Sequence, residues 1–455
     1  MSSYQLLLNN EQQGAYERIL NGENLFITGP GGTGKSFLIR AIVEAFESLD
    51  RRCAVVALTG CAAILLNCGA KTLHAWAGIR LAREPAKQLL DRIIADRRAL
   101  SRWRSTDLLI LDEVSMLQPE LLEKLDYIAK ETRHESNKPF GGMQVIFTGD
   151  FCQLPPVYNH TPIANGWAPG PKSAINDPDA PFFAFEHTLW SLLFPPGQTI
   201  ELTVNMRQSG DIEFQNMLNK VRFGICGASE QLLIRSAMRP LVAAEAAGVK
   251  PTRLFAMRAD AEKVNLAEMA ALAGPVHTYT AVSNIPPKVA RTQILYDAID
   301  KFDADSQYDP IVSLAVGAQV MLVYSIDVER GLYNGARGVI IGFTDADIPI
   351  VRFVHMPHKS VVIEKQVWEM CHPDFPGVSR SQIPLRIAWA ITIHKAQGAT
   401  LDCASIDIGP GVFEFGQAYV ALSRVRSLNA LQVINFATAG IKAHPKVIEF
   451  YHSIY

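Results

Sequence analysis

The chain has 455 residues, a length that excludes one ordinary core and by itself predicts about three domains. A hydrophobic content of 48% with 19% charged residues is typical of a globular protein, and no run approaches the ~18 apolar residues of a membrane span. The formal net charge of −2 excludes a global basic field, so a nucleic-acid-binding protein of this composition must concentrate its positive charge in a channel.

The first predicted helix follows Asn9 and Asn10 and ends near Asn21-Gly22. Gln12 lies three residues after Asn9, which is the spacing of a capping-box partner. Its amide carries both donor and acceptor groups, so it could equally read the edge of an adenine. The spacing leaves the two roles open.

A glycine-rich loop, Gly29 to Ser36, matches G-x-x-x-x-G-K-S at every fixed position. It follows a predicted strand, Leu25 to Ile27, and precedes a predicted helix, Phe37 to Leu49. This order is that of a phosphate-binding P-loop, because glycines bring successive N–H groups close to an anion at the positive end of a helix. The alternative is a glycine-rich turn without a ligand.

We expect this loop to bind the phosphates of ATP. Lys35 would reach the β- and γ-phosphates, and the Ser36 hydroxyl would be a ligand of Mg²⁺. The expected ATP-binding residues of the loop are Gly29, Gly31, Gly32, Thr33, Gly34, Lys35 and Ser36.

The next predicted strand, Ala54 to Leu58, leads to Thr59, and a second polar segment follows at Thr72 to Gly78. Small residues and hydroxyls at a strand end let a ligand backbone approach closely. His74 and Trp76 in the second segment could meet a phosphate or a base. The alternative is that both are plain core residues.

Residues 79–106 carry eight basic side chains against three acidic ones, and their leucines and isoleucines form one apolar face. The segment is therefore predicted to be a helical insert resting on the first domain. A solvated basic face and a phosphate-binding surface both explain the charge excess. If the insert contacts DNA, the side chains to test are Arg97, Arg98 and Arg102.

Two carboxylates end the apolar strand predicted at Asp107 to Glu113. Beside a P-loop, such a pair forms a Walker B element, in which Asp112 holds Mg²⁺ through a water or Ser36 and Glu113 polarises the attacking water. The alternative is a solvated Asp-Glu pair at a strand end.

A further strand, Gln144 to Thr148, leads to Gln153, which is placed to sense the γ-phosphate. Strands that alternate with helices predict a parallel sheet with ligands at the carboxyl ends of its strands.

The second half begins with a predicted strand, Thr199 to Val204, that leads to Arg207, and a further strand and helix follow at 253–257 and 259–273. Short β-rich runs then predict a small β-barrel inserted at about 277–384. Four residues of this insert are conceivable metal ligands, although their spacing matches no standard site. They are His355, His358, Cys371 and His372.

The α/β pattern returns with a strand predicted at Leu385 to Ile391 and the polar segment 392–398. A strand at Ala404 to Ile408 precedes a helix that contains Ala418 to Arg426. Arg424 lies near the end of this helix, where an arginine usually caps carbonyl groups.

Together these segments resemble the Pif (petite integration frequency) family of superfamily one helicases, the branch that moves 5′ to 3′. The most specific motifs are Gly-Asp-Phe-Cys-Gln-Leu-Pro-Pro at 149–156, Thr-Ile-His-Lys-Ala-Gln-Gly at 392–398 and Val-Ala-Leu-Ser-Arg-Val at 420–425. The P-loop and the Asp-Glu pair are shared by many ATPases and discriminate weakly. Matching stretches run in the family's order from residue 8 to residue 426.

The resemblance implies an α/β fold of two RecA-like parallel-sheet motor domains, 1–200 and 201–455, with ATP in the cleft between them. The basic segment 79–106 would be a strand-separating wedge in the first domain, and the small β-barrel would lie in the second. Arg207 and Arg424 would stabilise the γ-phosphate, and the implied ATP-binding residues include Gln12 and Gly398. The implied single-stranded DNA track consists of Thr59, His74, Thr392, His394 and Lys395.

Two departures from the family accompany the resemblance. The first motif starts close to the N-terminus, which favours a bacterial or phage origin, and Ala396 replaces the expected serine. No signal or transit peptide is recognised, and the seven cysteines contain no C-x-x-C pair, which favours reduced thiols and a cytoplasmic location.

The sequence thus predicts an ATP- and Mg²⁺-dependent DNA helicase that translocates on single strands, binds DNA junctions but no membrane, and acts as a monomer. One rival is a motor subunit of a recombination nuclease complex or a DNA-binding scaffold with a vestigial ATPase. Another is a small-molecule P-loop kinase, which explains the P-loop but not the two late arginines or the second α/β domain.

Overall fold

The structure is a computed structural model that describes residues 5–59, 62–63, 66, 68–80, 82–156, 161–163, 166–168, 182–241, 249–306, 308–327, 330–332, 334–370, 372 and 374–454. The chain forms two compact units. The first unit is Met1–Met206 with Ala443–Tyr455, and the second unit is Arg207–Lys442. Among the described residues, no helix is both long enough and apolar enough to cross a membrane.

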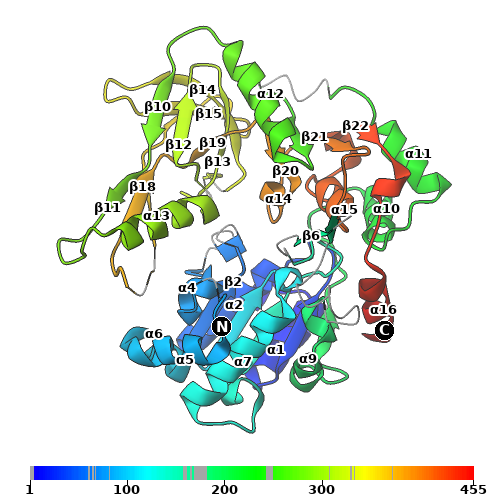
Figure 1. The fold of residues 1–455 in the computed structure, drawn as a ribbon. Coiled ribbons are helices and arrows are strands. Elements are labelled where there is room, and N and C mark those ends of the chain that lie inside the picture. Colours follow the sequence, from blue (N-terminus) through cyan, green and yellow to red (C-terminus); the bar gives the residue numbers. More distant parts are fainter. Residues whose placement is uncertain are drawn as a thin grey trace. The chain divides into compact units, whose positions relative to one another are not determined.

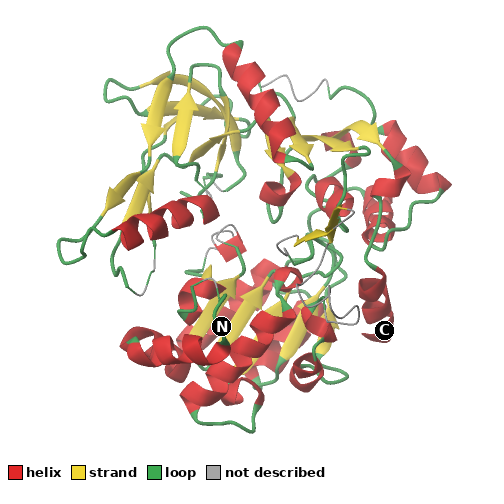
Figure 2. Cartoon of the chain, in the orientation of Figure 1, coloured by secondary structure: helices red, strands yellow, loops and turns green. Residues whose placement is uncertain are grey.

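The first unit is built on a six-stranded sheet with the order β3-β2-β4-β5-β1-β8. Every pairing in it is parallel, as the alternation of strands and helices predicts. All residues of β1, β4 and β5 are buried, which is typical of a parallel sheet covered on both faces (Figure 2). The strands are β1 (Leu25–Thr28), β2 (Cys53–Ala57), β3 (Lys71–Thr72), β4 (Leu108–Asp112), β5 (Gln144–Thr148) and β8 (Thr199–Glu201).

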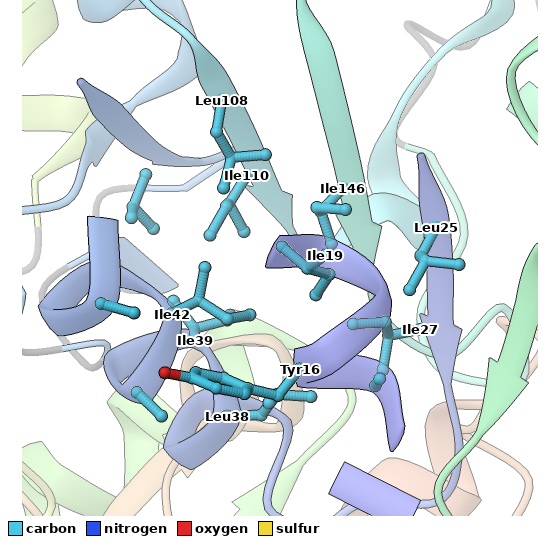
Figure 3. Close-up of a cluster of buried hydrophobic side chains, with 14 of the residues drawn as sticks. Tyr16, Ile19, Leu25, Ile27, Leu38, Ile39, Ile42, Leu108, Ile110 and Ile146 are labelled. Carbon is cyan, nitrogen blue, oxygen red and sulfur yellow. The ribbon is translucent and has the colours of Figure 1, made fainter. Parts of the chain in front are cut away.

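Helices α1 (Asn10–Leu20) and α2 (Lys35–Ser48) share one hydrophobic core with this sheet. Figure 3 shows Tyr16 and Ile19 of α1 gathered with Ile42 of α2 near the isoleucines of β1, β4 and β5. Full burial of such a side chain contributes about 1.5–3 kcal/mol. The core therefore fixes where β1 ends and α2 begins, and the glycine-rich loop lies between those two points.

The basic segment forms two helices, α5 (Ala86–Ala95) and α6 (Arg97–Ser105), which confirms the predicted helical insert. They lie on the first unit with α4 (Leu73–Ala77) and α7 (Pro119–Arg133). Trp103 of α6 is fully buried against Trp76 of α4, with ring centroids 4.7 Å apart, and its Nε1–H donates to the Ala77 carbonyl at 3.0 Å. Trp76 is thus a core residue.

The second unit contains a four-stranded parallel sheet with the order β20-β9-β21-β22. Its strands are β9 (Thr252–Phe255), β20 (Ala390–Thr392), β21 (Ala404–Ile408) and β22 (Leu431–Phe436). The helices of this α/β part are α10 (Ile212–Arg222), α11 (Ala228–Ser236), α12 (Arg258–Ala270), α14 (Ile393–Ala396) and α15 (Gln417–Leu422). Figure 1 shows α12 and α14 beside the same sheet. This is the second RecA-like core that the sequence predicts.

The β-rich insert of the second unit comprises antiparallel sheets of two, three and five strands. The orders are β10-β12, β11-β18-β17 and β16-β15-β14-β13-β19. Residues of the two- and five-stranded sheets share one hydrophobic core, and α13 (Gln293–Asp305), a helix that the sequence analysis does not predict, adds a smaller one. The strands are β10 (His277–Thr280), β11 (Val282–Asn284), β12 (Ile311–Leu314), β13 (Gln319–Leu322), β14 (Arg337–Phe343), β15 (Pro349–Phe353), β16 (Ser360–Val362), β17 (Gln366–Glu369), β18 (Ser379–Gln382) and β19 (Leu385–Ile387).

The strand expected at Leu385 to Ile391 is in fact two strands. β19 pairs antiparallel with β13 of the insert, whereas β20 pairs parallel with β9 of the α/β sheet. The change occurs at Ala388 and Trp389, whose backbone groups bond to Gln319 on one side and Arg253 on the other. The insert therefore extends to Ile387, because an apolar run does not specify which sheet it joins.

The last helix, α16 (Pro445–Ile454), belongs to the first unit, although the sequence analysis places it in the second domain. Its Val447 and Tyr451 are fully buried. The Phe450 ring stacks on Phe185 with centroids 4.2 Å apart, and Lys446 forms an ion pair with Glu186. These contacts are made with residues of the first unit. They place α16 in that unit, although the chain directly before it belongs to the second unit.

Candidate functional site: a phosphate cradle and two cationic segments

The glycine-rich loop joins β1 to α2 in a conformation that its glycines alone permit. Gly29, Gly32 and Gly34 have φ values of 132°, 96° and 83°, in the region that L-residues rarely adopt. A Cβ on Gly29 would overlap the Leu202 carbonyl oxygen, and one on Gly34 would overlap the Gln12 side chain. Gly34 is also the N-cap of α2, so the loop leads directly into the positive end of a helix.

Lys35 lies over this loop. Its Nζ donates to the carbonyl oxygens of Gly29 at 2.7 Å and Pro30 at 3.0 Å. The buried Thr33 hydroxyl also donates to Pro30, at 3.0 Å, and Ser36 is exposed in the first turn of α2. An ammonium group and a helix start at one loop form a site suited to a polyphosphate.

Gln12 forms the capping box that its spacing allows. Its Oε1 accepts from the Asn9 N–H at 3.1 Å, and the Asn9 side chain accepts from the Gln12 N–H at 2.9 Å. The Gln12 Nε2 donates to the carbonyls of Thr33 at 3.3 Å and Gly34 at 3.4 Å. The structural role is therefore present, and it brings the amide next to the P-loop, whereas adenine reading stays a prediction.

Asp112 ends β4 beside the P-loop and is buried. Its Oδ1 accepts a hydrogen bond from the Thr148 hydroxyl at the end of β5. Burial raises the pKa of the Asp112 carboxyl, while the Thr148 hydrogen bond and the charge of Lys35 act in the opposite direction. Thr148 is a partner that the sequence analysis does not identify, because two neighbouring strand ends meet only in the folded sheet.

Glu113 follows Asp112 in a left-handed conformation, with φ 57° and ψ 43°. This conformation is unfavourable for a residue with a side chain and marks a position where the surrounding structure imposes the backbone. A Cβ on Gly149 would lie 2.9 Å from the Val114 nitrogen, so the chain after β5 packs directly against the Glu113–Val114 backbone. Gln153 is buried, and its N–H donates to the Asp150 carbonyl at 2.9 Å.

The other predicted residues of the first unit occupy strand ends of the same sheet. Thr59 follows β2, and its hydroxyl accepts from the Ala62 N–H at 3.1 Å. His74 is a partly buried residue of α4, which begins directly after β3. The structure thus places both residues beyond carboxyl ends of parallel strands, where ligands of such sheets bind.

The second unit brings the two late arginines together. The Arg207 Nη1 donates to the Ser423 carbonyl at 3.1 Å, directly before Arg424 in the chain. Arg424 is 1% exposed, and its Nε donates to the Val420 carbonyl at 2.7 Å. The helix predicted to contain Arg424 is α15, and it ends earlier, at Leu422. The bond from Arg424 to the Val420 carbonyl therefore caps the C-terminal end of α15.

Besides the segment with the two arginines, α14 is a second cationic segment. The Thr392 hydroxyl caps its start and accepts a hydrogen bond from the Lys395 N–H at 3.3 Å. His394 and Lys395 are exposed, and Gly398 follows with φ 78°. Lys395 Nζ lies 3.6 Å from an Asp309 carboxylate oxygen.

Asp309 also accepts from Arg386, at 2.9 Å and 3.1 Å. Although burial opposes its charged form, Arg386 and Lys395 hold the pKa of the Asp309 carboxyl below its usual range. Neither Asp309 nor Arg386 is identified by the sequence analysis, because no motif contains them.

Three of the conceivable metal ligands, His355, His358 and His372, are described residues of the β-rich insert. Within the described ranges, no group of three or more His, Cys, Asp or Glu side chains is arranged to hold a metal ion. Cys371, one of the four conceivable ligands, lies outside the described residues.

Comparison with known proteins identifies the family. The model of the PIF1-like helicase family matches residues 7–231, and the model of the 2B domain of DNA helicase Pif1 matches residues 311–343. The human ATP-dependent DNA helicase PIF1 is 36% identical over 450 residues. That alignment covers 98% of this chain but 64% of the human protein, so the chain spans less than two thirds of this relative.

Solved structures agree with the sequence relatives over nearly the whole chain. Pif1 helicase from Candida albicans is 36% identical, with a TM-score of 0.79 and coverage of 98% of this chain and 99% of that one. A Pif1 helicase from Bacteroides, in complex with ADP-AlF3 and ssDNA, is 28% identical, with a TM-score of 0.65 and coverage of 98% and 97%. The chain described here, with its P-loop, its Asp-Glu strand end and its two RecA-like cores, therefore belongs to the PIF1-like helicase family.

Proposed function

We propose that this protein is an ATP-dependent DNA helicase that translocates 5′ to 3′ on single-stranded DNA. The observation that carries the proposal is the phosphate cradle Gly29 to Ser36, in which the Lys35 ammonium bonds to the carbonyls of Gly29 and Pro30. Its occurrence in a chain that matches Pif1 helicases over 98% of its length favours this function over other uses of a P-loop.

ATP is the nucleotide that these residues suit. The backbone N–H groups from Gly29 to Gly34 and the Lys35 ammonium would neutralise its phosphates. Gln12 and Gly398 are proposed as further contacts of the nucleotide. Mg²⁺ would add positive charge at the β- and γ-phosphates, held by the Ser36 hydroxyl and the Asp112 carboxylate, both of which are oxygen donors that this cation prefers.

Hydrolysis needs a polarised water and compensation of the developing negative charge. We assign polarisation of the attacking water to Glu113, which follows Asp112 in a backbone conformation that the surrounding structure imposes. We assign sensing of the γ-phosphate to Gln153. Arg207 and Arg424 are proposed as the cations that stabilise the γ-phosphate. Both guanidinium groups bond near the end of α15, Arg207 to the Ser423 carbonyl and Arg424 to the Val420 carbonyl and the Ser423 hydroxyl.

The DNA strand would be bound by Thr59 and His74 of the first unit and by Thr392, His394 and Lys395 of the second. Hydroxyl, imidazole and ammonium groups at strand ends and at the start of α14 suit phosphate contacts without sequence preference. The ATP cycle would change the grip of each unit on the strand and so produce stepping. We also infer a cytoplasmic location, consistent with free thiols at every described cysteine, and the bacterial or phage origin stays a prediction.

The test is the rate of ATP hydrolysis with and without single-stranded DNA, followed by unwinding of duplexes with 5′ or 3′ tails in DNA and RNA versions. A helicase of the proposed kind shows strong stimulation by single strands and unwinds the 5′-tailed DNA duplex. Absence of stimulation would favour a small-molecule P-loop kinase. Stimulation without unwinding would favour a motor subunit that needs partner proteins.

A further inference from the structure

A tyrosine close to the C-terminus lies inside the nucleotide-binding unit. Tyr451 of α16 is fully buried, and its hydroxyl is in contact with residues 300 and more positions earlier in the sequence. The Tyr451 hydroxyl donates to Asp150 Oδ1 at 3.1 Å and accepts from the Phe151 N–H at 3.2 Å. It lies 2.6 Å from the Thr28 hydroxyl.

The partners of this hydroxyl adjoin two parts of the proposed ATP site. Thr28 is the last residue of β1, and the next residue, Gly29, supplies a carbonyl that holds the Lys35 ammonium. Asp150 and Phe151 begin the segment that continues to Gln153, whose N–H donates to the Asp150 carbonyl. One phenol thus spans the start of the P-loop and the segment that carries the proposed γ-phosphate sensor.

The two sides of this bridge are held unequally. Thr28 lies in a strand that pairs with neighbours on both sides, β5 and β8. Residues 150–153 lie beyond the end of β5. There the Tyr451 hydroxyl bonds to a backbone group, the Phe151 N–H, whereas at Thr28 it contacts a side-chain hydroxyl only. The Phe151 ring adds packing contacts with Phe26 and Trp190. Removal of the Tyr451 hydroxyl would therefore disturb residues 150–153 more than the P-loop.

We propose that Tyr451 is a positioning residue for ATP hydrolysis, which sets the place of residues 150–153 relative to the P-loop. The proposal rests on the function proposed above. It assigns to the C-terminal helix a role in the catalytic step, although α16 follows the whole second unit in sequence. The helix itself is anchored independently of the hydroxyl, by the Phe450–Phe185 stack and the Lys446–Glu186 ion pair.

The test is Tyr451→Phe, which keeps the ring and removes the hydroxyl alone. Steady-state hydrolysis gives kcat and KM for ATP, titration gives Kd for ADP, and thermal unfolding gives Tm. We expect kcat to fall about tenfold or more while KM and Kd stay within about twofold, since a catalytic group displaced by on the order of 1 Å can cost about 10²-fold. Thr28→Val, which removes the hydroxyl on the β1 side, should lower kcat in the same direction, and the double variant should be less than additive.

Tyr308→Phe is the matched control. Tyr308 is a buried tyrosine of the second unit whose hydroxyl also donates to a carboxylate, that of Asp303, far in sequence from the P-loop motifs. Its variant should lower Tm with kcat unchanged. If Tyr451→Phe also lowers Tm and leaves kcat unchanged, Tyr451 has a structural role only and the proposal is overturned. If DNA does not stimulate hydrolysis by the parent protein, the proposed helicase function is refuted instead. The kcat of Tyr451→Phe relative to the parent protein would still decide the role of Tyr451.

Discussion

Replacement of Arg97 and Arg98 by alanine tests whether helices α5 and α6 contact nucleic acid. Both side chains are exposed at the start of α6, and the cap of this helix, Asp96 Oδ1, accepts from the Arg98 backbone N–H at 2.9 Å, a bond that alanine retains. Loss of two cations from a helix N-terminus is favourable by about 0.3–1 kcal/mol each, so the fold should survive. If both arginines contact phosphates, the salt slope of single-strand binding should fall by about 0.7 for each, or about 1.4 in total.

Arg102 must be excluded from this variant, although the sequence suggests it as a third contact. Its guanidinium points inward, and donates to the Trp76 carbonyl at 2.7 Å and the Ala75 carbonyl at 3.4 Å. Hydrogen bonds from charged groups contribute about 1.5–3 kcal/mol each, and a domain of this size loses about 2–4 °C of Tm per kcal/mol. Arg102→Ala should therefore lower Tm, and it serves as the control for damage to the insert.

The assays are DNA-stimulated ATP hydrolysis and unwinding of a 5′-tailed duplex. If the insert separates strands, Arg97→Ala with Arg98→Ala should leave hydrolysis largely unchanged and reduce unwinding sharply. Unchanged unwinding would identify a solvated basic face. Equal loss of both activities would place the insert in the single-strand track and refute the wedge.

Four further variants test the proposed site. Lys35→Ala should abolish hydrolysis and weaken nucleotide binding measured by titration, whereas Glu113→Gln should keep binding and lose turnover. Arg424→Ala should lower kcat by up to about 10³–10⁵-fold without rescue by lysine, and a thermal melt run in parallel measures the loss of its bond to the Val420 carbonyl. Asp309→Asn removes the anion beside Lys395, so single-stranded DNA should bind more tightly and with a steeper salt dependence; weaker binding would mean that Asp309 orients the lysine.

Sequence alone determined the parts of this protein whose chemistry is local. The P-loop is recognisable because its backbone conformation requires glycine at positions such as Gly29 and Gly34, and because one strand and one helix flank it within a few residues. The parallel sheets and the helical insert are predictable for the same reason, since hydrophobic periodicity reports which faces are buried.

The tertiary structure decided which partner each residue meets. Leu385 to Ile391 divides between two sheets, because an apolar strand has no preference among buried neighbours until the fold supplies them. Tyr451 reaches Thr28 and Asp150, and Asp309 meets Lys395 and Arg386, across separations in sequence at which no spacing rule applies. These contacts depend on side chains brought together by the packing of whole elements, a property of the folded chain rather than of any segment in it.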